Sequence, residues 1–389
     1  MINTVHDKLI FYISENHIAG ASIIVRRSGE IIHEEYLGHA DIAAGIPISP
    51  STIFRLASMT KPVIGVAVMQ LVEKGLVSLD DELAKYIPEF ADMQVASEQI
   101  VMTPDSDVTS LMAKAAEMTF VPLKRPIIIE DLLRHRSGIG QGLVSISRGI
   151  NNNVPGITLA QRVENIARCP MDFQPGEGTG YSAIAAFDVL GRIVELVTGK
   201  ELAVYLNESI FAPLDMTDTT FWPTAEQASR IPRLYKRPKD VLEDAFPDNN
   251  SANPHSFNYP CGSAGLHSTL HDYDRFVQML ANGGSLDGAR ILNPETIHQM
   301  ASRCETDPDS YTWGLSMNVF TPAAHPTRSL ADGVFGWSGA FGTHFFIDPV
   351  NDISMTFMVN RADINGASSY VSHAIEEAIF KGLDLKVSK

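Results

Sequence analysis

The most constraining feature of this sequence is the stretch RLASMTKPVIGVAVMQLVEKG, residues 55–75. From Val63 to Val72 it is apolar on nearly every helical face, which predicts a helix buried on all sides. Gly75 follows as a natural C-cap. A helix of this kind belongs to the interior of a large fold.

The size and composition of the chain indicate a soluble globular protein with two lobes. With 389 residues the chain exceeds the size at which a single compact core stops growing. Apolar residues make up 44% and charged residues 20% of the chain, both ordinary fractions. The net charge of −16 argues against a nucleic acid partner and against an anionic membrane surface. Because no run of about eighteen apolar residues occurs, we expect no membrane span.

The N-terminus and the cysteines indicate a cytoplasmic protein. The first apolar run, residues 9–13, is too short for the core of a secretory signal. The three cysteines, Cys169, Cys261 and Cys304, are far apart and form no CxxC pair. We therefore expect neither a disulfide framework nor a zinc site. The sequence does not indicate an oligomeric state.

Strand patterns lie at both ends of the chain, and helical patterns lie between them. Residues 3–17 could form an amphipathic helix, and two strands joined at Ser28-Gly29 follow. After Pro260, the helical pattern STLHDYDRFVQMLANGG leads to the strand-like segments WGLSMNVF, GTHFFIDP and ISMTFMVNR. An Asn351-Asp352 turn separates the last two, and a final helix is expected near residues 368–382.

These patterns predict one α/β (α+β) catalytic domain, residues 1–389, with two subdomains. Residues 1–75 and 255–389 would form an α/β subdomain whose sheet is completed by both ends of the chain. Residues 76–254 would form a mostly helical subdomain, because helical patterns alternate there with long loops. The part from 222 to 260 carries six prolines and few periodic positions, so it is expected to be a lid-like loop.

Ser58 and Lys61 stand three residues apart where the apolar helix begins, so they would lie one turn apart on the same face. A serine hydroxyl is a weak nucleophile unless an adjacent base takes its proton. Burial and the positive end of a helix dipole both favour the neutral, basic form of an amine. Backbone N–H groups at a helix start can also stabilise an oxyanion. The stretch therefore predicts a nucleophile, a base and half an oxyanion hole.

A plainer interpretation of this motif is a helix cap with a solvated lysine. The SxxK spacing arises by chance about once in a chain of this length. Lys61, however, precedes a helix that is almost wholly apolar, whereas a solvated lysine belongs on an amphipathic helix. Its position favours the catalytic interpretation.

Two further segments carry candidate residues. Tyr181 follows a Gly/Pro-rich turn and precedes a strong helical pattern in FQPGEGTGYSAIAAFDVLGRIVELVTGK. Trp337, Ser338 and Gly339 precede a small-residue turn into a strand in FGWSGAFGTHFFIDP. Each segment alone would be explained by packing at the start of a helix or strand.

Together the ordered blocks SMTK, LLRHRSGI, PGEGTGYSAIAAFDVLGRIVELVTGK, GSAGLHSTLHDYDRF and GWSGAFGTHFFIDP resemble the serine β-lactamase-like superfamily. That superfamily contains class C β-lactamases, D-Ala-D-Ala carboxypeptidases, D-aminopeptidases and family VIII carboxylesterases. The resemblance extends from about residue 5 to the end of the chain. It implies a β-lactamase/transpeptidase-like fold, with an antiparallel sheet flanked by helices, and no cofactor.

The resemblance also implies a role for each matching residue. Ser58 would be the acylated nucleophile and Lys61 its proton partner. Tyr181 would pass the proton to the leaving group and activate the deacylating water. The backbone N–H groups of Ser58 and Ala340 would form the oxyanion hole.

The chain departs from the usual motifs at two substrate-binding positions. The second motif commonly reads Tyr-x-Asn, but here Ala183 takes the place of the asparagine. The third motif commonly begins with Lys or His, which supplies a cation for a substrate carboxylate, and here Trp337 stands there with Ser338 and Gly339. Tryptophan at this position is similar to family VIII esterases. We therefore expect a serine carboxylesterase acting on neutral short- to medium-chain esters.

Alternative functions remain open. An amidase, a D-aminopeptidase or a weak β-lactamase could use the same machinery, and a non-catalytic binding protein could keep the fold. The HxxxH pair in HSTLH, His267 and His271, suggests a surface pair on a helix more than a zinc site. His135 is expected to be a buried hydrogen-bonding residue. His344 is a candidate for lining the substrate pocket, although packing is the better explanation of it.

Overall fold

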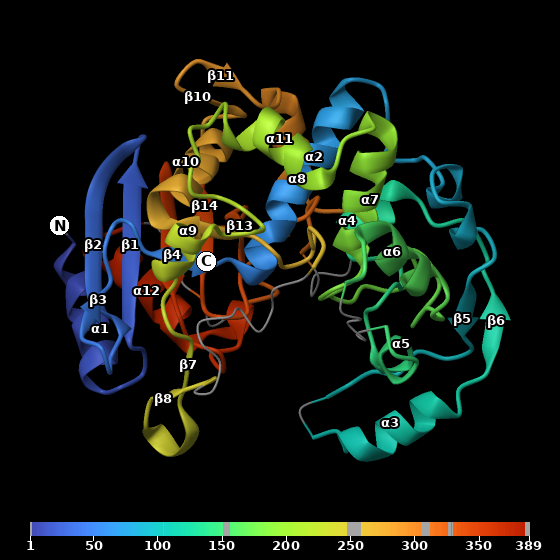
Figure 1. Cartoon of the computed structure of the whole chain (residues 1–389), viewed down its shortest axis with the longest axis horizontal. Coiled ribbons are helices and arrows are strands. Elements are labelled where there is room, and N and C mark those ends of the chain that lie inside the picture. Colours follow the sequence, from blue (N-terminus) through green and yellow to red (C-terminus); the bar gives the residue numbers. More distant parts are fainter. Residues whose placement is uncertain are drawn as a thin grey trace. The chain divides into compact units, whose positions relative to one another are not determined.

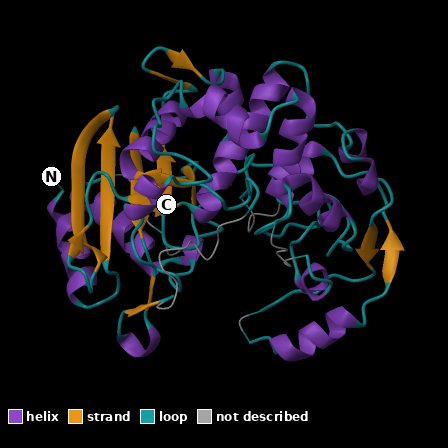
Figure 2. Ribbon diagram, viewed as in Figure 1, coloured by secondary structure: helices purple, strands orange, loops and turns teal. Residues whose placement is uncertain are grey.

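The computed structural model describes residues 2–103, 105–150, 156–246, 258–304, 312–325, 328 and 330–385. The chain divides into two compact units, each with its own set of helices and strands (Figures 1 and 2). The first unit comprises Met1–Pro62, Leu206–Ser256 and Ala264–Lys389, and the second comprises Val63–Tyr205 and Phe257–Ser263.

The first unit is built on an antiparallel sheet that both ends of the chain complete. In the described residues the sheet has seven strands in the order β12-β13-β14-β15-β1-β2-β3. The C-terminal strand β15 pairs with the N-terminal strand β1, so the expected fold class is confirmed. The strands are β12 (Asn318–Val319), β13 (Phe335–Ser338), β14 (His344–Asp348), β15 (Ile353–Val359), β1 (Gly20–Arg27), β2 (Glu30–Asp41) and β3 (Ile46–Pro47).

Side chains alternate between the two faces of this sheet, and each face is covered by helices. Helices α1 (Asn3–Ser14) and α12 (Tyr370–Gly382) pack with inward-facing residues of β1, β14 and β15 in one apolar core. Helix α10 (Leu270–Ala281) packs against the other face. There Asp274, which is buried, pairs with Arg26 at 2.8 Å and accepts from the Thr356 hydroxyl at 3.2 Å. This helix is therefore held to the sheet by a buried ion pair as well as by apolar packing.

The turns expected between strands are found where the sequence placed them. Ser28 and Gly29 both have positive φ, 51° and 80°, between β1 and β2. Asp352, with φ of 55°, lies in the turn between β14 and β15. Of the expected strand WGLSMNVF, only Asn318–Val319 is paired in the sheet.

The remaining small elements of the first unit flank the sheet. They include two short antiparallel pairs that matter for the sites below, β4 with β9 and β7 with β8. The elements are β4 (Ile53–Arg55), β9 (His267–Thr269), β7 (Tyr235–Lys236), β8 (Glu243–Asp244), β10 (Ser285–Leu286), β11 (Ala289–Arg290), α9 (Ala225–Ser229) and α11 (Pro294–Met300).

The second unit is mostly helical. Helix α2 (Thr60–Glu73) enters it at Val63, and a two-stranded pair, β5 (Gln94–Ala96) with β6 (Phe120–Pro122), lies at its edge. Its other helices are α3 (Val108–Ala116), α4 (Ile129–Leu133), α5 (Leu143–Ser147), α6 (Leu159–Ala167), α7 (Ala186–Thr198) and most of α8 (Leu202–Leu206).

Helix α2 is buried along its length, as its composition predicts. Val63, Val68 and Met69, which point in different directions around the helix, are all 0% exposed. At its C-terminal end Gly75 has a φ of 65° and donates to the Val72 carbonyl at 2.9 Å. Leu76 donates to the Leu71 carbonyl at 3.0 Å, which completes a Schellman motif.

The boundary between the units differs from the expected one at 254. Residues 206–256 belong to the first unit, because the segment around Arg233 joins its sheet through the backbone. Arg233 donates to the Ala40 carbonyl at 2.9 Å, and Tyr235 donates to the Asn360 carbonyl at 3.1 Å. The segment has few periodic positions, so the sequence did not reveal these partners. Residues 247–257 of the expected lid-like loop lie outside the described residues.

Residues 257–263 also belong to the second unit, and Asp188 of α7 holds this segment. The Asp188 side chain is 0% exposed. Asp188 accepts from the Tyr259 hydroxyl at 3.0 Å and from the Ser263 N–H at 3.1 Å. The guanidinium of Arg162 lies 3.6 Å away as its cation. One buried charge thus connects two helices with a segment some seventy residues further along the chain.

Removing this carboxylate should therefore destabilise the protein strongly. We expect Asp188→Ala to lower the free energy of unfolding by about 3–5 kcal/mol, because Arg162 would be left as a buried, unpaired charge. Urea denaturation measures the difference, with Asp92→Ala at an exposed position as the control. Equal losses in the two variants would contradict this description.

Candidate active site

Ser58 lies in a single 3₁₀ turn, Ala57–Met59, that connects β4 to α2. Its side chain is half-buried, whereas Lys61 is 0% exposed. The Lys61 Nζ donates a hydrogen bond to the Ser58 Oγ at 3.3 Å. The contact expected from the SxxK spacing is therefore present.

The backbone before Ser58 is strained. Ala57 has a φ of 45°, a conformation that costs a residue with a side chain on the order of 1–3 kcal/mol. The neighbouring residues hold the turn in place: Leu56 donates to the Leu266 carbonyl at 2.9 Å, and Tyr273 donates to the Met59 carbonyl at 2.8 Å. Strain that the surroundings enforce in this way is common at functional sites. Nothing in the sequence around Ala57 signals it.

The third motif lies directly against this turn. The Gly339 backbone packs on the Leu56 carbonyl, and a Cβ on Gly339 would lie 2.2 Å from that oxygen and 2.2 Å from the Thr343 Oγ1. Thr343 in turn donates its hydroxyl to the Leu56 carbonyl at 3.2 Å. Glycine is therefore required at this position because two backbone segments approach closely. The structure thus brings Gly339 and its neighbours next to the turn that carries Ser58.

Ala340 meets one requirement of an oxyanion donor. It is exposed, and its N–H makes no hydrogen bond within the described part of the chain. The neighbouring Gly339 N–H, in contrast, is already used, because it donates to the Thr343 carbonyl at 2.7 Å. The role of Ala340 stays a prediction.

Trp337 forms part of an aromatic wall. Its ring centroid lies 4.6 Å from that of Trp313, with the two planes tilted by 60°. Both rings line a cavity of about 270 Å³ together with Phe320 and Phe345. Its polar lining residues are Asn318, His325, Arg328, Ser338, His344, Ser368 and His373.

Beside this cavity, Ser338 begins a chain of buried polar groups. Its hydroxyl lies 2.8 Å from the Nδ1 of His344, and the Nε2 of His344 lies 2.8 Å from the Oε1 of Glu376. Arg328 donates to the same carboxylate through two nitrogens, with Nε 3.0 Å from Oε2. Ser338, His344 and Glu376 are 5%, 6% and 1% exposed.

The charge on Glu376 determines the direction of these hydrogen bonds. Burial raises the pKa of Glu376, but Arg328 and His344 outweigh it and lower that pKa to about 2. The ionised carboxylate can only accept, so the His344 Nε2–H donates to it. The other ring nitrogen of His344, Nδ1, then faces the Ser338 hydroxyl. His344 lines the cavity beside Trp337 and contacts Ser338, and its role in binding substrate stays a prediction.

Tyr181 and Ala183 belong to the second unit. Tyr181 is half-buried in a loop five residues before α7, and its ring lies 4.8 Å from that of His135. His135 is 0% exposed and accepts a hydrogen bond from the Ser182 N–H at 3.1 Å. His135 is therefore a buried hydrogen-bonding residue, as expected. Ala183 is exposed.

The histidines of HSTLH do not form a surface pair on one helix. His267 lies in β9 and is 2% exposed, and only His271 lies on α10. Burial lowers the pKa of His267 to about 4. The expected helical pair is wrong because α10 begins at Leu270. Among the described residues, no three His, Cys, Asp or Glu side chains gather as a metal site would require.

Comparison with known proteins identifies the family. A family model described as Beta-lactamase matches residues 6–379. The chain belongs to the β-lactamase family. Protein Rv1367c of Mycobacterium tuberculosis is 31% identical, with 88% of this chain and 86% of that protein covered. Esterase EstB of Burkholderia gladioli is 30% identical, with 94% and 92% covered.

Solved structures show the same fold. EstCE1, a hydrolase with promiscuous acyltransferase activity, superimposes with a TM-score of 0.78 at 23% identity. The match covers 97% of this chain and 98% of EstCE1. The resemblance predicted from the ordered motifs is confirmed. Within the described residues of this family member, no helix is long and apolar enough to cross a membrane.

The buried carboxylate beneath the third motif gives a pH-dependent prediction. The pKa of Glu376, about 2, lies below its ordinary value of 4.5, so its ionised form stabilises the fold. This contribution is complete above pH 4.5 and is lost as the pH falls toward 2. We expect Glu376→Gln to cost on the order of 2–4 kcal/mol at pH 7 and distinctly less at pH 3.

Urea denaturation at the two pH values measures this difference. Glu377→Gln, which alters the exposed neighbour on the same helix, should change stability little at either pH. A penalty for Glu376→Gln that is the same at pH 3 and pH 7 would show that the charge of Glu376 does not stabilise the fold.

Proposed function

We propose that the protein is a serine carboxylesterase that works through an acyl-enzyme at Ser58 and acts on neutral short- to medium-chain esters. The observation that carries the proposal is the contact of the buried Lys61 amine with the Ser58 hydroxyl. The turn that carries Ser58 also packs against the third motif, which here begins with tryptophan. The 30% identity to Esterase EstB over nearly the whole chain supports it.

The proposed reaction follows from the groups around Ser58. Lys61 takes the proton as the Ser58 Oγ attacks the ester carbonyl. The N–H groups of Ser58 and Ala340 stabilise the oxyanion that forms. Tyr181 passes the proton to the departing alcohol and then activates the water that hydrolyses the acyl-enzyme. Water thus restores the free Ser58 hydroxyl and releases the acid.

The preference for a neutral substrate rests on the third motif. Trp337 occupies the position where related enzymes carry a cation, and it packs against Trp313 to form an apolar wall. Arg328 also lines the cavity beside it, but the ionised Glu376 already pairs with this cation. A substrate carboxylate would therefore gain little there. Ala183 likewise lacks the amide that orients peptide and β-lactam substrates.

Two other functions have less support than the esterase function. An amidase, D-aminopeptidase or weak β-lactamase could use Ser58, Lys61 and Tyr181, but it would lack the two substrate-binding groups that Ala183 and Trp337 replace. A non-catalytic binding protein would have no need of the buried amine at Ser58. A cytoplasmic location remains part of the proposal, on the evidence of the cysteine pattern in the sequence.

Lys61 and Tyr181 should act as one proton network. We expect Lys61→Met and Tyr181→Phe each to lower kcat/KM for p-nitrophenyl butyrate by about 10²- to 10⁴-fold. The double variant should lose much less than the product of the two losses, because either change breaks the same network. Tyr86→Phe, a tyrosine elsewhere in the second unit, is the control and should keep full turnover. Multiplicative losses would mean that the two residues serve separate steps.

The substrate class is tested by restoring the missing cation. A charge-assisted hydrogen bond contributes about 1.5–3 kcal/mol, or roughly 10- to 150-fold in specificity. We expect Trp337→Lys to raise kcat/KM for nitrocefin relative to p-nitrophenyl butyrate within this range. Trp337→Leu, which removes the ring without adding charge, should not change the ratio. A wild type that hydrolyses nitrocefin as fast as the ester would overturn the esterase proposal.

A further inference from the structure

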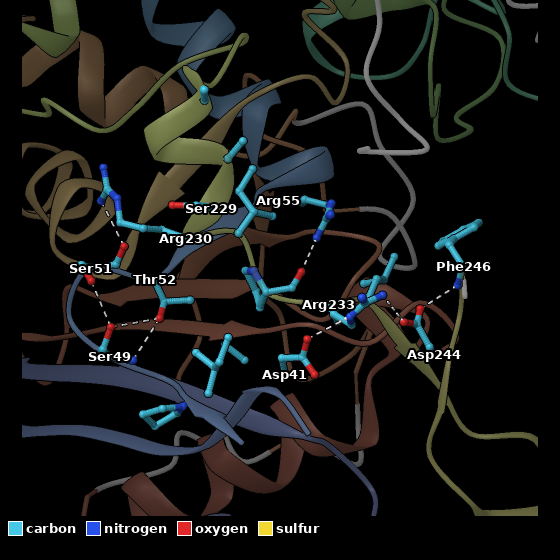
Figure 3. Close-up of a pocket in the computed structure, with 18 residues that line it drawn as sticks. Asp41, Ser49, Ser51, Thr52, Arg55, Ser229, Arg230, Arg233, Asp244 and Phe246 are labelled. Atoms are coloured by element: carbon cyan, nitrogen blue, oxygen red, sulfur yellow. Dashed lines mark hydrogen bonds and ion pairs between the residues drawn. The ribbon is translucent and has the colours of Figure 1, made fainter. Parts of the chain in front are cut away.

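A second cavity lies in the first unit, between the end of β2, the strand β4, helix α9 and the segment around β7 and β8 (Figure 3). Its volume of about 500 Å³ is in the range of small-molecule sites. One part of its lining is apolar and another carries hydroxyl groups. The apolar lining residues include Ile46, Pro47, Ala225, Ile231, Leu234 and Phe246, and the hydroxyls belong to Ser49, Ser51, Thr52 and Ser229.

Three arginines line this cavity, and two of them are already neutralised. Arg230 pairs with Asp218 and Glu226. Arg233 pairs with Asp41 at 3.0 Å and with Asp244 at 2.6 Å (Figure 3). A ligand would gain little from either guanidinium, because both already have carboxylate partners.

Arg55, the third arginine, is different. It is the last residue of strand β4 and is only 8% exposed, and no carboxylate in the described residues forms an ion pair with it. The Asp244 carboxylate acts on it electrostatically, but Asp244 already pairs with Arg233 at 2.6 Å. Its Nη1 donates to the Pro232 carbonyl at 2.8 Å (Figure 3), and its Nε is buried without a hydrogen-bond partner. Burial lowers its pKa to about 10, so it stays charged at neutral pH. A buried cation without a directly paired anion is costly, and an anionic ligand in contact with Arg55 would relieve that cost.

We propose that this cavity binds a monocarboxylate with an apolar body, its carboxylate on Arg55. One guanidinium without a carboxylate in contact can hold one ligand carboxylate, whereas a phosphate dianion would bring a second negative charge into a cavity that Asp41 and Asp244 already line. The guanidinium fork suits a carboxylate, and the apolar lining covers a hydrocarbon chain. The carboxylic acid that ester hydrolysis releases is such a monocarboxylate. Only this link between the cavity and ester hydrolysis rests on the proposed function.

The cavity shares a wall with the turn that carries Ser58. Leu234 packs with Ala57 and Phe341 in one small core, and Phe246 packs against it. Leu234 and Phe246 line the cavity, whereas Ala57 precedes Ser58 and Phe341 follows Ala340. A bound acid would therefore contact side chains that support the candidate oxyanion hole.

Isothermal titration calorimetry with sodium octanoate tests the proposal without using turnover, so a missing esterase activity would not affect it. We expect octanoate to bind wild type and to bind Arg55→Met about 10- to 100-fold more weakly. Ser229→Ala is the matched control in the same wall, because its hydroxyl already donates to the Glu226 carbonyl at 2.6 Å. It should bind octanoate as wild type does.

A second variant keeps the charge of Arg55 and fills the cavity. Ala228→Phe points a ring into the cavity from α9 and should also abolish binding, which covers the case in which Arg55→Met fails to fold. Octanol should bind at least tenfold more weakly than octanoate. Octanoate binding that survives both variants would overturn the proposal, and so would inorganic phosphate that binds as tightly as octanoate.

Discussion

The hydrogen bond between the Lys61 amine and the Ser58 hydroxyl is the interaction on which the rest of the site depends. A fully buried lysine is rare because its charge is costly to remove from water, so a protein keeps one only where it has a use. The turn that presents Ser58 is strained at Ala57, and the packing of Gly339 against Leu56 holds it in that form. The close approach of two backbone segments thus places the candidate nucleophile beside its candidate base and a candidate oxyanion donor.

The third motif explains how common machinery can be directed to a different substrate. In related enzymes a cation at this position holds a substrate carboxylate, whereas here Trp337 and Trp313 form an apolar surface. Arg328, an arginine that lines the same cavity, is used inside the protein, where it keeps Glu376 ionised and thereby orients His344 and Ser338. The charge in this part of the site is therefore balanced before any substrate arrives, which favours a neutral ester.

Local patterns predicted the local features well. The hairpin turns, the buried helix α2 with its cap at Gly75 and the contact between Ser58 and Lys61 all follow from residue spacing over a few positions. Such features depend on neighbours in the chain, which the sequence contains directly.

Long-range features could not be predicted in this way. Glu376 lies in an amphipathic helix like many exposed acids, and only the fold reveals that it meets His344 and Arg328. Arg55 looked like an ordinary part of the motif region until its burial without a carboxylate was visible. The boundary near Leu206 was missed because backbone hydrogen bonds, which carry no side-chain signature, tie Arg233 to the first unit.

The central claim is that Ser58 is the nucleophile. The most direct measurement is the intact mass of the protein after treatment with a fluorophosphonate, followed by peptide mapping of the adduct. We expect one adduct per chain, located on Ser58, and its loss in Ser58→Ala. An adduct on another serine, such as Ser338, or no adduct in a protein that hydrolyses esters, would contradict it.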